Sequence, residues 1–169
     1  MNDLSATTQQ YVWSKTRSPD RHYELKSGSE VCGVLNFAGG SGSLARAETA
    51  HGSWTLKRQG FLSPRVTVRV SGCDDTVGVF TPAWSGGGEF LCRGTGYEVS
   101  ATGWFRPTWT IRSGGRRVLH TESKGGETLV YLDGGVQPEP DILSLLLVLT
   151  VYVPVVAAED AAVIVAIAG

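Results

Sequence analysis

The stretch PDILSLLLVLTVYVPVVAA, residues 140–158, decides the fold of this chain. Between Asp141 and Glu159 it carries no charged residue, and its apolar residues fall on every side of a helix. A helix that is apolar all round must be surrounded either by lipid or by the interior of its own protein. Which of the two encloses it depends on what the rest of the chain can build.

The sequence before this stretch, residues 11–135, alternates apolar and polar residues in about twelve short segments, which is the pattern of β-strands. Residues 66–70 and 108–112 are examples. Turns rich in glycine, such as 39–42 and 113–115, separate the segments. The intervals are too short for a crossover helix, so we predict an antiparallel sheet with one apolar and one polar face.

A mostly β fold follows, namely a closed antiparallel barrel of about twelve strands. Because side chains alone fill a barrel of about eight strands, a wider one needs a plug. The apolar run 142–153 suits this role, since as a helix it spans ~18 Å at ~1.5 Å per residue, about the length of a strand. We therefore predict a hydrophobic C-terminal α-helix in the centre of the barrel.

The boundaries of this organisation are also predicted from the sequence. Residues 1–10 are expected to be a flexible N-terminus, and residues 11–169 a single barrel domain with strands over about 11–135. The central helix is expected over about 141–153, because Pro140 and Asp141 favour a helix start and Pro154 should end or kink it. The structure of the tail, residues 154–169, stays open.

A transmembrane helix is the alternative for this run. Its ~18 Å falls short of the ~30 Å hydrocarbon core of a bilayer. Pro154 lies within the run, Glu159 and Asp160 follow it, and no Lys or Arg flanks it, which argues against insertion.

Charge and cysteine content restrict the class of protein. The chain of 169 residues has 15 Lys and Arg against 16 Asp and Glu, so it lacks the basic excess typical of a nucleic-acid-binding domain. Cys32, Cys73 and Cys92 are odd in number, and the first residues do not form a secretory signal. We expect a cytoplasmic protein with reduced cysteines, which associates peripherally with a membrane if it binds one.

The whole pattern resembles the tubby C-terminal-like superfamily, which includes tubby, the phospholipid scramblases and the plant LURP-one-related proteins. The features that carry the resemblance are about twelve strands, a Pro-Asp entry and an apolar C-terminal helix. GSWTLKR at 52–58, VGVF at 77–80 and WTI at 109–111 are similar to strands of the LURP-one-like branch. The resemblance covers the chain from about Tyr11 and implies a twelve-stranded barrel threaded by the helix.

The functional residues of these families have no counterparts here. The basic motif with which tubby domains bind phosphoinositides is not found, nor are the cysteine cluster and the acidic Ca²⁺ segment of the scramblases.

Motifs for catalysis or cofactor binding are weak. GSGSLA at 40–45 fits a dinucleotide fingerprint, but no helix is expected to follow it. Asp74 and Asp75 fall in a turn, and the histidines and cysteines lack the spacing of a zinc site. No Gly-x-Ser-x-Gly elbow is present. We therefore expect no catalytic residue, no cofactor, no metal and no enzymatic activity.

Two groups of residues are candidates for binding. Four basic residues on neighbouring strands are a candidate patch for an anion or a lipid headgroup: Lys57, Arg58, Arg65 and Arg69. Arg116 and Arg117 at a hairpin tip are a weaker candidate. Most tryptophans are expected in the core, but Trp84 falls in the loop PAWSGGG and is a candidate binding aromatic.

These observations leave three functional hypotheses. The first is a non-catalytic module of the tubby-like type that binds anionic lipid headgroups or a protein partner. The second is a carrier of a small ligand, or an enzyme, with its site at the barrel mouth. The third is a scramblase-like membrane protein with residues 142–158 in lipid. The ligand and the oligomeric state do not follow from the sequence.

Overall fold

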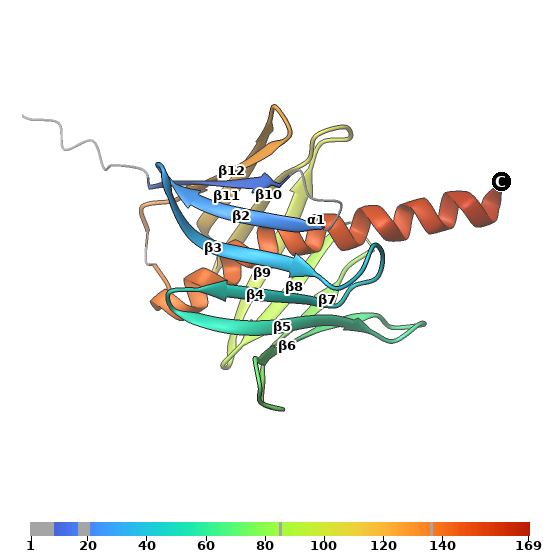
Figure 1. The fold of residues 1–169 in the computed structure, drawn as a ribbon, viewed down its shortest axis with the longest axis horizontal. Helices are drawn as coiled ribbons and strands as arrows, with labels where there is room; N and C mark the ends of the chain where they lie inside the picture. The colour runs from blue at the N-terminus through green and yellow to red at the C-terminus, as the bar shows by residue number, and fades with distance from the viewer. Residues whose placement is uncertain (1–8, 17–20, 85, 136) are drawn as a thin grey trace, which may run out of the picture.

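The protein is a closed barrel of twelve antiparallel strands with one helix running through it, as Figure 1 shows. The computed structural model describes residues 9–16, 21–84, 86–135 and 137–169. The predicted fold class is confirmed. Most of the predicted flexible N-terminus, residues 1–8, lies outside the described residues.

The strands follow one another along the chain and around the barrel, and the first pairs with the last. Their bounds are β1 Gln10–Lys15, β2 His22–Ser27, β3 Glu30–Phe37, β4 Ala45–Thr49, β5 Gly52–Gln59, β6 Arg65–Val70, β7 Thr76–Pro82, β8 Gly87–Cys92, β9 Thr95–Thr102, β10 Thr108–Ser113, β11 Arg116–Lys124 and β12 Glu127–Leu132. Closure is made by β1 and β12, where Gln10 lies opposite Tyr131 and Trp13 opposite Thr128. The described strands therefore leave no open sheet edge.

The helix α1, Pro140–Ala168, begins where the sequence predicts and fills the barrel. Its side chains are buried from Ser144 to Val153, and Leu146, Val148 and Tyr152 have no measurable exposure. They pack against the inward residues of the strands, such as Leu56 and Phe90. A wide barrel thus becomes a solid core, and the apolar run is covered by protein in this conformation.

The helix does not end at Pro154, which differs from the expected end of the central helix at about residue 153. It continues for fourteen residues to Ala168, which assigns a structure to the tail that the sequence left open. A proline inside a helix removes one backbone hydrogen bond, so packing has to compensate for it. Val156 is still buried in the core, and the next turn is held by ion pairs of Glu159 and Asp160.

The two ends of the barrel differ in how they meet the helix. Asp141, at the start of α1, pairs with Arg93 in the β8–β9 connection, 2.6 Å away. Near its other end, α1 contacts the β3–β4 loop through Tyr152 and the end of β5 through Asp160. We call the first the entry end and the second the exit end. Figure 1 shows α1 projecting from the barrel beyond the exit end.

Candidate functional site

The exit end carries every connection from an odd-numbered to the next even-numbered strand, because neighbouring strands are antiparallel. Three of these loops have large apolar side chains at their tips. The five side chains concerned are each at least 91% exposed: Phe61 and Leu62 between β5 and β6, Trp84 between β7 and β8, and Trp104 and Phe105 between β9 and β10. We call these five residues the apolar tips.

Two of the three loops are built alike. GFLSP at 60–64 joins β5 to β6, and GWFRP at 103–107 joins β9 to β10. In both, the first glycine has a positive φ, +90° at Gly60 and +99° at Gly103, and the proline precedes the next strand. A residue with a Cβ is strained in that conformation. Each loop thus turns sharply and presents two apolar side chains to solvent.

The entry end has a different surface. None of its connections, over the residues that the structure describes, carries a large exposed hydrophobic side chain. Its exposed carboxylates include Asp74, Asp75 and Glu139. Outside α1 and the apolar tips, four large apolar residues are partly exposed, at 36% to 52%: Val31, Val70 and Leu91 in strands, and Leu44 in the β3–β4 loop. Fully exposed apolar side chains are therefore a property of the exit end alone, within the described ranges.

Exposed basic residues also lie at the exit end, two of them next to the apolar tips and two on other strands of the rim. They are Lys15 at the end of β1, Arg65 at the start of β6, Arg106 beside Phe105, and Lys124 at the end of β11. Glu127, an acidic residue at this end, lies directly across from Lys124. The exit end therefore combines apolar projections with a net positive rim over the described residues.

The four residues of the predicted basic patch do not share one face. Lys57 and Arg65 lie on the outer face of β5 and β6, diagonal to each other in the register. Arg58 lies on the face of the buried Leu56 and pairs with Asp160 of α1. Arg69 is at the far end of β6, 4.0 Å from Asp74. The structure thus brings Lys57 and Arg65 together near the exit end and separates the other two.

A collar of polar contacts holds α1 where it leaves the barrel. Arg21, at the start of β2, is only 8% exposed; it pairs with Glu159 and donates a hydrogen bond to the Gly42 carbonyl at 2.9 Å. Its guanidinium lies 4.5 Å from the centre of the Phe37 ring. Arg58 pairs with Asp160. Both acidic residues of this turn are therefore neutralised by arginines of the barrel.

Tyr152 completes the collar from inside. Its hydroxyl donates a hydrogen bond to the Ser43 carbonyl at 2.5 Å, and its ring stacks on Phe37 with the centroids 5.5 Å apart. Burial raises the pKa of the Tyr152 phenol well above its usual range, because the phenolate would have to leave water.

This pKa predicts a loss of stability at alkaline pH. The folded protein holds the Tyr152 proton more tightly than the unfolded chain, so its contribution is complete below pH ~10 and is lost as pH rises further. Between pH ~9 and ~11, wild type should lose about 1 kcal/mol more unfolding free energy than Tyr152→Phe. Urea denaturation at both pH values measures this, and equal losses in both proteins would contradict it.

The barrel mouth leaves little room for a small ligand. The hollow there has a volume of about 90 Å³, and Trp13, Thr150 and Pro154 are among the residues that line it. Pockets for small molecules commonly have ~300 to 1,000 Å³. Since α1 and the collar fill the mouth, the geometry gives no support to a carrier or an enzyme with its site at this place.

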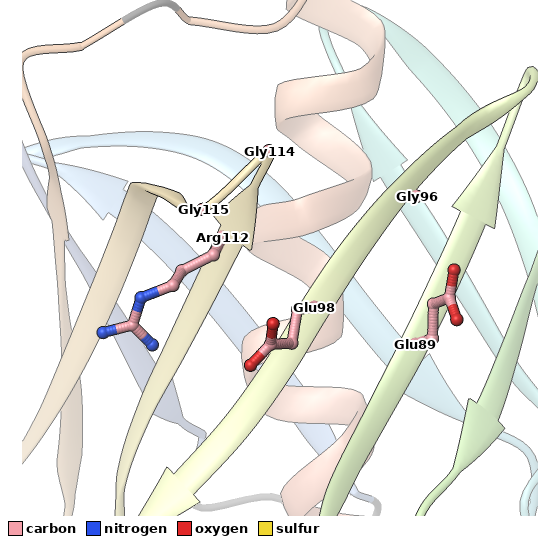
Figure 2. A pocket seen from close by; sticks show the side chains of 6 residues that line it. All are labelled: Glu89, Gly96, Glu98, Arg112, Gly114 and Gly115. Atoms are coloured by element: carbon pink, nitrogen blue, oxygen red, sulfur yellow. The ribbon is translucent and has the colours of Figure 1, made fainter.

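A polar hollow of about 320 Å³ on the side of the barrel is shallow and mixed in charge. Glu98 in β9 lies between Glu89 of β8 and Arg112 of β10. Figure 2 shows the Arg112 side chain turned away from both carboxylates. The described part of the chain has no group of three His, Cys, Asp or Glu residues placed to hold a metal ion.

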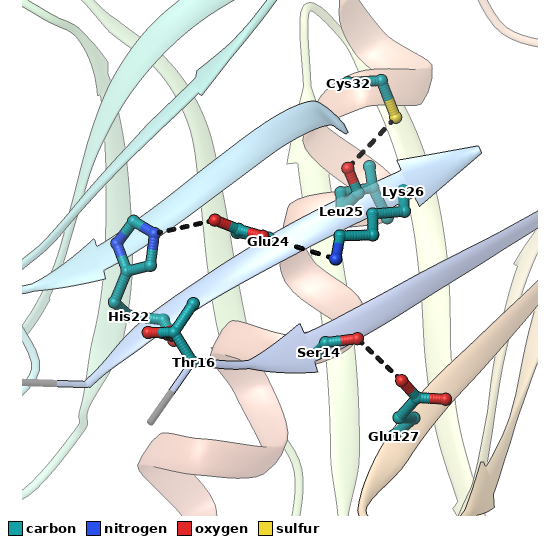
Figure 3. A network of polar contacts seen from close by, with 8 residues as sticks. All are labelled: Ser14, Thr16, His22, Glu24, Leu25, Lys26, Cys32 and Glu127. Atoms are coloured by element: carbon teal, nitrogen blue, oxygen red, sulfur yellow. Dashed lines mark hydrogen bonds and ion pairs between the residues drawn. The ribbon is translucent and has the colours of Figure 1, made fainter. Parts of the chain in front are cut away.

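A second polar cluster lies on the outer face of β1 to β3, shown in Figure 3. Glu24 is 3.6 Å from Lys26 and 3.8 Å from His22, and Ser14 donates a hydrogen bond to Glu127. The Cys32 thiol donates to the Leu25 carbonyl, and burial raises its pKa. A raised pKa disfavours the reactive thiolate, so this cluster has the character of a solvated strand surface.

The burial of the tryptophans differs in part from the prediction. Trp84 is fully exposed, as predicted, and Trp13 and Trp54 are buried. Trp104, expected in the core, is 99% exposed, because it lies in the loop before β10. Phe61, Leu62 and Phe105 were not expected to be exposed. The repeated pattern of glycine, two apolar residues, one further residue and proline is the signal that identifies them.

No family model, no curated protein and no solved structure matches this chain. The resemblance to the tubby-like superfamily therefore stays a prediction from the sequence.

Proposed function

We propose that this protein is a non-catalytic binding module of the tubby-like type that docks on anionic membrane surfaces through the exit end of its barrel. The observation that carries the proposal is the gathering of all five apolar tips at that end. Exposing several large aromatic side chains to water is costly unless they have an apolar partner. Trp and Phe at loop tips suit the interfacial region of a bilayer.

The arrangement of the tips favours a lipid surface over a protein partner. The tips come from three separate loops, which join β5 to β6, β7 to β8 and β9 to β10 and lie next to one another along one side of the rim. A fluid surface accommodates separated projections, whereas a folded partner needs a continuous complementary patch. Lys15, Arg65, Arg106 and Lys124, with Lys57 on the outer face, supply positive charge for acidic headgroups.

Flotation of the full chain with vesicles tests the proposal. We expect binding to phosphatidylcholine vesicles with about 30% phosphatidylserine, weaker binding at high salt, and little binding to pure phosphatidylcholine. The triple variant Trp84→Ser/Trp104→Ser/Phe105→Ser should stay in the unbound fraction. Leu91→Ser, on a strand, is the matched control and should float like wild type.

Two charge-reversal variants distinguish the electrostatic part of membrane binding from the apolar part. Arg106→Glu, at the exit end, should weaken binding by ~2 kcal/mol, or about thirtyfold, because two charges change near the surface. Arg116→Glu, in β11 at the entry end, should have no such effect. Failure of wild type to float with anionic vesicles would rule out the membrane and leave a protein partner as the remaining binding hypothesis.

A further inference from the structure

The projecting end of α1 is apolar on every side. After Asp160 the helix has no charged or polar side chain, and four large residues are 57% to 81% exposed: Val163, Ile164, Val165 and Ile167. At 100° per residue these four point in different directions around the axis. A helix that docks in a protein groove exposes one apolar stripe, whereas one apolar all round is suited to lipid.

The described part of this segment is long enough to enter one leaflet. The eight residues Ala161–Ala168 span ~12 Å at ~1.5 Å per residue. One leaflet contributes about half of the ~30 Å hydrocarbon core. These eight residues can therefore reach through most of the hydrocarbon of the leaflet nearest to the barrel.

The collar sets where the insertion begins. Glu159 and Asp160 are the last charged residues, and both are paired with arginines of the barrel. Paired in this way, they bring no unbalanced negative charge to an anionic surface. The collar also fixes the direction of α1, which continues out of the barrel beyond the exit end, as Figure 1 shows.

Resting on the proposed function, we infer that residues 161–168 of α1 enter the acyl-chain region of the docked leaflet, with the Arg21–Glu159 and Arg58–Asp160 pairs at headgroup level. The apolar tips then lie in the interface around the inserted helix, and the entry end faces the water. The barrel stands end-on to the membrane, and a single helix is both its core and its anchor.

A depth measurement tests this inference. A fluorophore sensitive to polarity is attached to Ile164→Cys in a Cys32→Ser/Cys73→Ser background, which leaves only the buried Cys92. The same label on Ala157→Cys reports the collar, and on Asp74→Cys, at the fully exposed turn between β6 and β7, it reports the entry end. The vesicles contain about 30% phosphatidylserine and carry nitroxides either in the acyl chains or in the headgroups.

We expect the label at 164 to shift to the blue and to be quenched more by acyl-chain nitroxides than by headgroup nitroxides. The label at 157 should show the reverse order, and the label at 74 should not respond. Ile164→Asp/Ile167→Asp should bind at least about a hundredfold more weakly, since two large apolar side chains are lost from lipid.

Two results would overturn the inference. If the protein floats but the label at 164 is quenched only from the headgroups, the exit end docks without insertion and the proposed function stands. If that label shifts to the blue without vesicles, in proportion to protein concentration, a second copy of the chain covers the helix. Absence of flotation by the unlabelled wild type would instead remove the proposed function itself, and the inference with it.

Discussion

Leu146→Asp is expected to abolish folding of the barrel. Leu146 is completely buried at the centre of α1, among the inward side chains of the strands. Removing such a side chain costs ~2 to 5 kcal/mol, and an unpaired carboxylate in its place costs several more. Because a domain is stable by only ~5 to 15 kcal/mol, the protein should fail to fold. Soluble yield and far-ultraviolet circular dichroism measure the effect.

The control for this substitution lies on the same helix. Ile164→Asp introduces the same carboxylate at a position that is 66% exposed, beyond the collar. It should leave solubility and the melting temperature close to those of wild type, because water solvates the charge. A soluble Leu146→Asp protein with a cooperative unfolding transition would show that the core of the barrel is not formed by this helix.

Trp13→Ala is expected to be the second most disruptive of these changes. Trp13 is 1% exposed, and its indole nitrogen donates a hydrogen bond to the Leu147 carbonyl at 3.1 Å, which ties β1 to α1. Loss of so large a buried side chain should cost ~3 to 5 kcal/mol of unfolding free energy. Urea denaturation followed by circular dichroism gives the value directly.

Of two further variants, Trp13→Phe shows how much of the lost unfolding free energy comes from the buried ring of Trp13 and how much from its hydrogen bond, and Trp104→Ala is the exposed comparison. Trp13→Phe keeps a ring in the core and loses the hydrogen bond, so it should cost less than Trp13→Ala. The Leu147 carbonyl still accepts a hydrogen bond from the Thr150 hydroxyl at 2.6 Å, which leaves the acceptor satisfied. Trp104→Ala, at an exposed tip, should change the stability by less than ~0.5 kcal/mol. A similar effect at both tryptophans would contradict the assignment of Trp13 to the core.

The architecture was predictable because the chain contains two different sequence patterns, one typical of strands and one typical of an enclosed helix. Alternation such as that of residues 66–70 identifies strands, and an uncharged run with Pro140 and Asp141 at its start identifies a helix that has to be enclosed. Neither pattern alone gives a filled barrel. The width of a barrel of about twelve strands and the length of the run together predict that the barrel contains the helix.

The helix beyond Pro154 was not predictable from local sequence. The rule that proline ends a helix describes the backbone alone. Here residues distant in sequence outweigh it, because Arg21 and Arg58 hold the turn at Glu159 and Asp160 in place. Such contacts become visible only once the barrel has brought β2 and β5 next to the end of α1.

The candidate site was only partly predictable for a similar reason. Exposure of Trp84 followed from the glycines beside it, whereas Trp104 was expected in the core with the other tryptophans, although Gly103 and Pro107 mark a loop around it. That the tips gather at one end depends on strand parity: Phe61 and Phe105 are 44 residues apart in the chain, yet both follow an odd-numbered strand. Whether a loop follows an odd- or an even-numbered strand is known only after every strand has been assigned.

Closure of the barrel by β1 and β12 affects how the chain folds during its synthesis. Gln10 has to find Tyr131, and the helix that fills the interior leaves the ribosome after all twelve strands. Contacts between residues so far apart form slowly and leave apolar surface exposed in the meantime. A nascent chain that has not yet been extended to Pro140 lacks the helix that fills the barrel interior. The filled barrel can therefore form only after α1 has been synthesised.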